Sequence, residues 1–196
     1  MNRTSLDSVS VEEPVPVDDL ARLVGERLRA ARRERGLSLG ALAEAAGIGK
    51  GSLSEIENGI RNPTLSTLYA LAGALGVTLG ALLAGRVGAT VASPGIEARL
   101  LDVSHEGGYT VEVYRLRILP GDFHPSVPHG PDVTEHLLVT AGRARVGRLG
   151  AETEIGPGES AQWVSDVPHG YAALGDGPVE SVLVIRTPGG AVTDVR

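Results

Sequence analysis

The apolar residues of this chain change their spacing once, close to residue 84. From Asp18 to Leu83 they recur every three or four positions, which is the period of an amphipathic helix. Beyond Ala84 the pattern changes to short β-like runs, separated by turn clusters such as Glu106-Gly107-Gly108. The sequence therefore predicts a helical region followed by an all-β sandwich or barrel.

Capping residues divide the helical region into about five short helices. Gly36 closes a first apolar stripe, and Ser38 is a natural N-cap for a second helix. A short third helix is expected from about Gly49 to Asn58, and either Thr64 or Ser66 can cap the next one. These elements predict a compact helical bundle.

The charge is also divided between the two regions. The whole chain of 196 residues has a net charge of -6. Residues 20–86 hold nine basic residues against five acidic ones, a net charge of +4. Residues 87–196 hold eight arginines against fourteen acidic residues, a net charge of -6. A basic module joined to an acidic one favours nucleic acid as a partner of the first module only.

Several classes of protein are excluded by composition. The chain has no cysteine, which rules out disulfides and thiolate metal sites. No apolar run approaches the ~20 residues of a membrane helix. The N-terminus lacks the apolar segment of a secretion signal, so we expect a cytoplasmic protein with no membrane partner.

Lys50 is the only lysine in the chain, and it lies between Gly49 and Gly51 at the start of the predicted third helix. A lysine there can donate to guanine O6 or N7, or to a phosphate. The flanking glycines remove side chains and allow close approach of the backbone. The alternative is a solvated surface lysine.

The segment LRAARRERGLSLGALAEAAGIGKGSLSEIENGIRNPTLSTLYALAGALGV closely resembles the Cro/C1-type, or XRE-like, helix-turn-helix family. The resemblance rests on many linked positions, among them Leu28, Arg32, Ser38, Leu42, Ala43, Gly47, Ile48, Leu53, Ser54, Ile56, Glu57, Gly59, Pro63, Thr64, Leu68 and Leu75. It implies that the third helix is the recognition helix, whose first residues face base edges.

The resemblance assigns roles to individual residues. Lys50, Gly51, Ser52 and Glu55 are expected on the DNA-facing surface, where Glu55 either accepts from a cytosine amino group or serves only as a solubilising charge.

Behind and beside that surface, the resemblance places Asn58 and Arg61 at phosphates. It pairs Arg32 with Glu57, and Arg32 can also reach a phosphate. Leu39 stands where the family commonly has a polar residue, so that contact is expected to be lost.

The β region is similar to the cupin family, a small double-stranded β-helix barrel. Its PGDFHPSVPHGPDVTEHLLVTAG and GPGESAQWVSDVPHGY segments look like the two cupin motifs, with His129, Glu135 and His169 at ligand positions. Two imidazoles and one carboxylate suffice for a divalent transition metal such as Fe, Zn, Ni or Mn. Pro131 occupies the place of a further histidine, so the four-ligand site is incomplete and plain surface histidines are the alternative.

Two other histidines are expected outside this site. Strand alternation places His136 on the face opposite to Glu135, and we expect His124 to be a loop residue.

The expected division of the chain follows from these assignments. It comprises a disordered tail (1–19), the helix-turn-helix domain (20–84, with its motif at about 39–58), a linker (85–95), the cupin domain (96–188) and a C-terminal tail (189–196).

The two resemblances together imply a function. We expect a sequence-specific transcriptional regulator, not an enzyme, that binds a palindromic double-stranded operator as a homodimer. Its cupin domain would dimerise and sense a small-molecule effector. One alternative is a non-haem iron oxygenase similar to the helix-turn-helix–cupin epoxidase that makes fosfomycin. In that epoxidase type a histidine stands four residues before the glutamate, where this chain has Pro131. A second alternative is a cupin domain that serves only as a dimerisation scaffold.

Overall fold

The computed structural model describes residues 17–189. Most of the predicted N-terminal tail, residues 1–16, and the C-terminal residues 190–196 therefore lie outside the described residues. The first helix already begins at Val17, inside the segment predicted as a tail.

Five helices form the N-terminal part of the described chain, as the sequence predicts. They are α1 (Val17–Glu34), α2 (Leu39–Ala45), α3 (Lys50–Glu57), α4 (Leu65–Leu75) and α5 (Leu79–Leu82). The side chain of Ser38 accepts from the Ala41 N–H and caps α2. Thr64, not Ser66, caps α4 by accepting from the Thr67 N–H. These caps satisfy N–H groups that have no partner within their own helix.

The bundle closes around leucines that the helical period places inward, including Leu28, Leu42, Leu53 and Leu68, all fully buried. Helices α1 and α3 approach each other closely at Gly25. A Cβ added there would lie 2.4 Å from the Ile56 carbonyl oxygen, so only glycine allows this contact. The close approach fixes α3 against α1.

Ten strands follow the helices in two sheets. The strands are β1 (Thr90–Ser93), β2 (Ile96–Glu106), β3 (Tyr109–Ile118), β4 (His124–Ser126), β5 (Thr134–Ala141), β6 (Ala144–Arg148), β7 (Thr153–Ile155), β8 (Ser160–Val164), β9 (His169–Ala173) and β10 (Val179–Pro188). One sheet has the order β1-β2-β3-β10-β5-β8 and the other β4-β9-β6-β7. The predicted fold class, α followed by a cupin-type β domain, is confirmed, although hydrogen bonding does not close the described strands into one barrel.

Three of the described strands carry no clear alternating signal in the sequence. Strands β4 and β7 have three residues each, too few for a periodic signal. Strand β1 lies inside residues 85–95, which we predicted as a linker, and pairs antiparallel with β2. His124, expected in a loop, lies in β4, with its ring against Gly95. A Cβ at Gly95 would lie 2.2 Å from the His124 Cε1.

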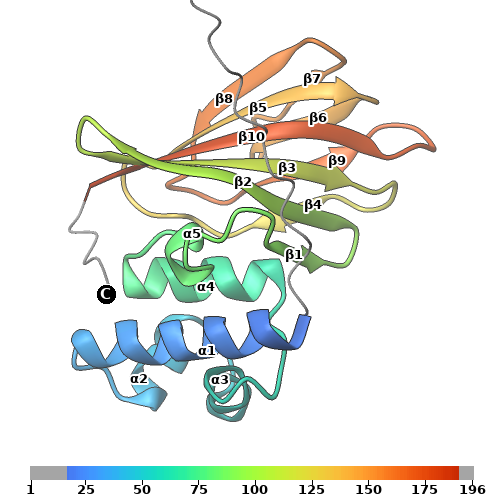
Figure 1. The fold of residues 1–196 in the computed structure, drawn as a ribbon. Helices are drawn as coiled ribbons and strands as arrows, with labels where there is room; N and C mark the ends of the chain where they lie inside the picture. The colour runs from blue at the N-terminus through green and yellow to red at the C-terminus, as the bar shows by residue number, and fades with distance from the viewer. Residues whose placement is uncertain (1–16, 190–196) are drawn as a thin grey trace, which may run out of the picture.

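The helical and β regions pack directly against each other. Helices α4 and α5 lie next to the strands, whereas α2 and α3 lie at the opposite end of the molecule (Figure 1). The Ser66 N–H donates to the Ser93 hydroxyl at 3.1 Å, and the Gly80 N–H donates to the buried carboxylate of Glu112. Buried apolar residues run without interruption from the bundle into the sandwich. The two regions therefore form one packed body.

Among residues 17–189, no helix is both long and apolar enough to cross a membrane.

Candidate DNA-binding surface and candidate metal centre

Helix α3 lies at the end of the bundle that is far from the strands (Figure 1). Its polar residues face solvent. Leu53 and Ile56 hold its inner face in the core. Lys50 is exposed in the first turn, and its side chain makes no hydrogen bond or ion pair with another described residue. Gly51 is also exposed, and a Cβ added there would meet no heavy atom within 4 Å. Nothing within the described chain therefore blocks the start of α3.

A buried ion pair sets the position of α3 relative to α1. The Arg32 guanidinium donates to both carboxylate oxygens of Glu57, at 2.6 and 2.7 Å, and to the Leu37 carbonyl at 3.0 Å. The side chains of Arg32 and Glu57 are only 12% and 2% exposed. Because these donors face Glu57 and the Leu37 carbonyl, Arg32 links α1 to α3.

Arg29 adds a second link between the same helices, which sequence reasoning missed. Its guanidinium lies 3.4 Å from Glu57 and donates to the Asn58 side-chain oxygen at 2.5 Å. Arg29 and Arg32 are three residues apart on α1 and therefore share a face, a spacing visible in the sequence. Asn58, expected at a phosphate, is exposed but already bonded to Arg29.

The remaining predicted contact residues form a small cluster beside α3. Arg61 donates to the Ser52 hydroxyl at 3.0 Å and lies 3.4 Å from the Glu55 carboxylate. Arg61 and Glu55 are about half exposed, so the pair is solvated and easily rearranged. Next to it, just after α3, the apolar residue Ile60 is 76% exposed, and the sequence did not single it out.

The three predicted metal-ligand residues come together inside the β region. His129 follows β4, Glu135 lies in β5 of the six-stranded sheet, and His169 lies in β9 of the four-stranded sheet. The His129 Nδ1 and His169 Nε2 each lie 2.9 Å from the same carboxylate oxygen, Oε1 of Glu135. All three donor atoms lie within 4.8 Å of one another.

These donor atoms are oriented by neighbours. The His169 Nδ1 donates to the Val167 carbonyl at 2.9 Å, which leaves Nε2 to face the site. His129 Nε2 shares a hydrogen bond of 3.2 Å with the Ser126 hydroxyl, so its Nδ1 faces the same point. The Tyr171 hydroxyl donates to the second carboxylate oxygen of Glu135. Tyr171 lies two residues after His169 and so shares its side of β9, a signal present in the sequence.

The electrostatics of the site favour the ionised carboxylate. Burial opposes the charged form, but the imidazoles of His129 and His169 outweigh it and hold the pKa of Glu135 well below its usual range. Burial would lower the pKa of His169, yet the adjacent Glu135 carboxylate raises it overall. The site is therefore a buried carboxylate between two imidazoles.

The residues fit a divalent metal. The converging atoms, His129 Nδ1, Glu135 Oε1 and His169 Nε2, are buried, and their only close polar neighbours in the described chain are one another, at 2.9 Å but without the geometry of a hydrogen bond. Such atoms are costly to bury unless something binds them. Donors at about 2.1 Å from a metal, at angles near 90°, lie about 3 Å apart. The two separations from Glu135 Oε1 match this value, whereas the widest separation in the set, 4.8 Å, would have to shorten when an ion binds. Pro131 is exposed and supplies no ligand, and His136 is exposed on the opposite strand face.

One aromatic residue joins this centre to the helical bundle. Tyr69 of α4 stacks on the His129 ring, with centroids 4.1 Å apart and planes inclined by 12°. Sequence reasoning placed Tyr69 nowhere near the β region, because the contact spans two separately patterned regions. The candidate ligand His129 is thus in direct contact with the helix-turn-helix bundle.

Comparison with known proteins agrees with both halves of this architecture. A helix-turn-helix family model matches residues 28–82, and a cupin domain model matches residues 114–185. The class is therefore a helix-turn-helix protein with an appended cupin domain.

Relatives narrow this class further. The chain is 29% identical over 176 residues to the HTH-type transcriptional regulator SutR of Escherichia coli K12, covering 88% of this chain and 99% of the relative. It is 45% identical over 60 residues to the HTH-type transcriptional regulator y4dJ of Sinorhizobium fredii, covering 31% of this chain and 78% of the relative. A crystal structure of an HTH_3 family transcriptional regulator from Vibrio cholerae has a TM-score of 0.77 at 26% identity, covering 89% of this chain and 100% of that one. The chain belongs to the XRE-type helix-turn-helix transcriptional regulators with a C-terminal cupin domain.

Proposed function

We propose that this protein binds a specific DNA operator through α3 and that its cupin domain dimerises and senses a small molecule. The observation that carries the proposal is the unobstructed start of α3, with exposed Lys50 and Gly51, behind which the buried Arg32–Glu57 pair fixes the helix. A rigid helix with a free donor at its first turn suits entry into the major groove.

The DNA-facing residues take different roles in this proposal. Lys50 reads a base or binds a phosphate, and Gly51 lets the backbone approach. Ser52, Glu55 and Arg61 form an adjustable polar cluster from which Arg61 turns to a phosphate. Asn58 contacts the backbone beside it, and Arg32 acts only by positioning α3.

The operator is proposed to be a palindrome bound by a homodimer in the cytoplasm. A single short recognition helix gives little affinity, which favours two-fold binding. The outer face of the six-stranded sheet offers a strip for a second copy in which apolar and polar residues alternate: Val182 lies between Leu138 and Arg115, and Val184 lies between Val113 and His136. Leu138 is 41% exposed there. Leu138→Glu should convert a dimer to a monomer in light scattering, whereas an unchanged mass would remove this strip from the interface.

His129, Glu135 and His169 are proposed to hold a divalent transition metal, with Fe, Zn, Ni and Mn as candidates. When bound, the metal would supply a positive charge next to the Glu135 carboxylate and the two imidazole nitrogens. Chelator-treated protein should regain thermal stability with one equivalent of a fitting metal.

Matched variants test this assignment. Glu135→Gln should lose the metal-dependent rise in melting temperature, while the exposed neighbour variant His136→Gln should keep it. Equal metal responses of wild type and Glu135→Gln would refute this ligand set.

The iron-oxygenase alternative is not favoured. SutR, which this chain matches over 99% of the length of SutR, is a transcriptional regulator. In addition, Pro131 stands four residues before Glu135, where the epoxidase type has a histidine. Substrate-dependent uptake of O₂ by the iron-loaded protein would be needed to reopen it.

Selection from a randomised duplex library tests the proposal as a whole. Full-length protein should enrich a sequence with two inverted half-sites about one helical turn apart, or ~34 Å. Affinity for it should fall steeply with salt, because binding releases counterions. Recovery of no sequence, together with an affinity that stays flat between low and physiological salt, would refute DNA binding.

A further inference from the structure

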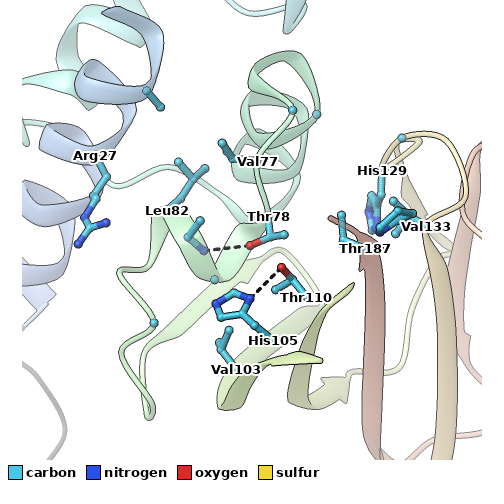
Figure 2. Close-up of a pocket in the computed structure, with 18 of the residues that line it drawn as sticks. Arg27, Val77, Thr78, Leu82, Val103, His105, Thr110, His129, Val133 and Thr187 are labelled. Atoms are coloured by element: carbon cyan, nitrogen blue, oxygen red, sulfur yellow. Dashed lines mark hydrogen bonds between the residues drawn. The ribbon is translucent and has the colours of Figure 1, made fainter. Parts of the chain in front are cut away.

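A cavity of about 440 Å³ lies between the helical bundle and the β region. Its helical wall comes from α1 and from the segment joining α4 to α5, including Val77 and Thr78. Its other walls come from β2, β3, β10 and the loop between β4 and β5, which includes His129. Figure 2 shows Arg27 on one side of this space and His129 on another, with His105 and Thr110 between them. The volume is in the range that small-molecule sites occupy.

The chemistry of the walls points to an anion with an apolar body. Arg27 is half-buried, and its guanidinium makes no hydrogen bond or ion pair with any other residue of the described chain. Arg35 and Glu34 also line the cavity, so its charged groups sum to +1. Val77, Leu82 and Val103 supply apolar surface between the charged wall and the β region. A half-buried, unpaired guanidinium presents a fork of donors suited to a carboxylate, sulfonate or phosphate.

His105 adds a directed polar group at the opposite wall. Its Nδ1 is hydrogen-bonded to the Thr110 hydroxyl at 3.1 Å (Figure 2), which fixes the ring. The other ring nitrogen, Nε2, remains for a second partner. A ligand with an anionic group at Arg27 would therefore meet a second polar anchor across the apolar surface.

We propose that this interdomain cavity, which adjoins the His129–Glu135–His169 centre and has His129 in its wall, is the effector site, and that it takes a small organic anion with an apolar, ring-sized body. The proposal deepens the sensing role above and rests on it. Ligand binding in this cavity would reach the DNA-binding surface through α1. Arg27 lies on the helix whose Arg29 and Arg32 hold Glu57 of the recognition helix. A ligand that contacts both α1 and the β region binds some arrangements of the two regions more tightly than others. It therefore shifts the population of these arrangements, and with it the orientation of α3.

A pair of dyes tests the site without knowledge of the natural effector. 1-Anilinonaphthalene-8-sulfonate carries an aromatic body and one sulfonate, and N-phenyl-1-naphthylamine has the same body without the charge. Full-length protein should bind one sulfonate dye per chain, about tenfold or more tightly than the neutral dye, since a charge-assisted contact is worth about 1.5–3 kcal/mol. Arg27→Gln should remove this preference and leave neutral-dye binding unchanged.

Arg33→Gln is the matched control, because Arg33 is an exposed arginine of the same helix that does not line the cavity. It should bind both dyes as wild type does. If Arg27→Gln and wild type bind the sulfonate dye equally, the cavity is not an anion site and the proposal falls.

DNA binding is measured on the same samples with the selected duplex. In wild type, saturating sulfonate dye should change the DNA affinity severalfold, and in Arg27→Gln it should not. Dye binding that leaves wild-type DNA affinity unchanged would overturn the effector role. An absence of DNA binding without any dye would instead count against the proposed function, and so the two failures are distinguishable.

Discussion

Lys50 is the residue that best tests the proposed reading of DNA bases, because its side chain is exposed and has no hydrogen bond or ion pair within the described chain. If it donates to a base, Lys50→Ala should cost about 1–3 kcal/mol at the selected operator and relax preference at one base pair per half-site. If it contacts only phosphate, operator and random duplexes should weaken equally and the salt slope should fall by about one unit. Wild-type affinity for every duplex would make Lys50 a simple surface lysine.

Gly51 permits a cleaner separation of binding from folding. A Cβ at this position meets nothing within 4 Å of the protein, and alanine favours a helix over glycine by up to about 1 kcal/mol. Gly51→Ala should therefore leave the melting temperature unchanged or slightly raised. Its methyl group would stand between the helix and the DNA, and operator affinity should fall at least severalfold in a gel-shift titration. Undiminished affinity would mean that the backbone of Gly51 does not approach the duplex.

At the scale of elements, the packing of α3 on α1 depends on a buried charge as well as on apolar contacts. Arg32→Ala leaves Glu57 buried with only Arg29, at 3.4 Å and on the edge of the site. Removing one partner of a buried pair costs about 3–5 kcal/mol, and the remaining Arg29 contact should reduce this loss to about 2–4 kcal/mol. Thermal unfolding of the full chain should report a drop of several degrees.

Two further variants separate charge burial from the loss of the arginine itself. Arg29→Ala, at a position 37% exposed, should cost about 1 kcal/mol or less. Arg32→Leu combined with Glu57→Leu should recover much of the stability, because it leaves no buried charge unpaired. If the double variant is as unstable as Arg32→Ala, the packing of the Arg32 and Glu57 side chains, and not their charges, stabilises the position of α3.

At the scale of the whole molecule, Glu112 of β3 links the two domains by accepting from the Gly80 N–H of α5. Burial raises the pKa of Glu112 from 4.5 to about 7, although the Gly80 hydrogen bond favours the charged form. Because the folded state holds this proton more tightly than the unfolded chain, stability should fall as the pH rises from about 4.5 to about 7 and then level off.

Glu112→Gln keeps a neutral acceptor for Gly80 and should remove that fall. From pH 5 to pH 8 wild type should lose on the order of 3 kcal/mol relative to the variant, measured by urea unfolding. Glu97→Gln, at an exposed position of β2, should behave as wild type at both pH values. Parallel pH profiles for wild type and Glu112→Gln would mean that Glu112 titrates normally.

The sequence by itself determined the features that depend on neighbours a few residues apart. Ser38 caps α2 because a cap needs only its own helix, whereas for α4 the sequence offered both Thr64 and Ser66 and the structure selects Thr64. The spacing of Leu53 and Ile56 sets which face of α3 turns inward and hence which residues remain for DNA. Glu135 faces inward and His136 outward because side chains alternate along a strand.

Only the tertiary structure decided how these elements meet. The short strand β1 forms because β2 is there to pair with it, and His124 is placed by the glycine it packs against. The stacking of Tyr69 on His129 and the cavity between α1 and the β region arise from packing two patterned surfaces. Burial of apolar area is non-directional, so periodicity predicts which face is buried but not which surface covers it. That choice depends on shape and on polar contacts between residues far apart in sequence, such as Gly80 with Glu112.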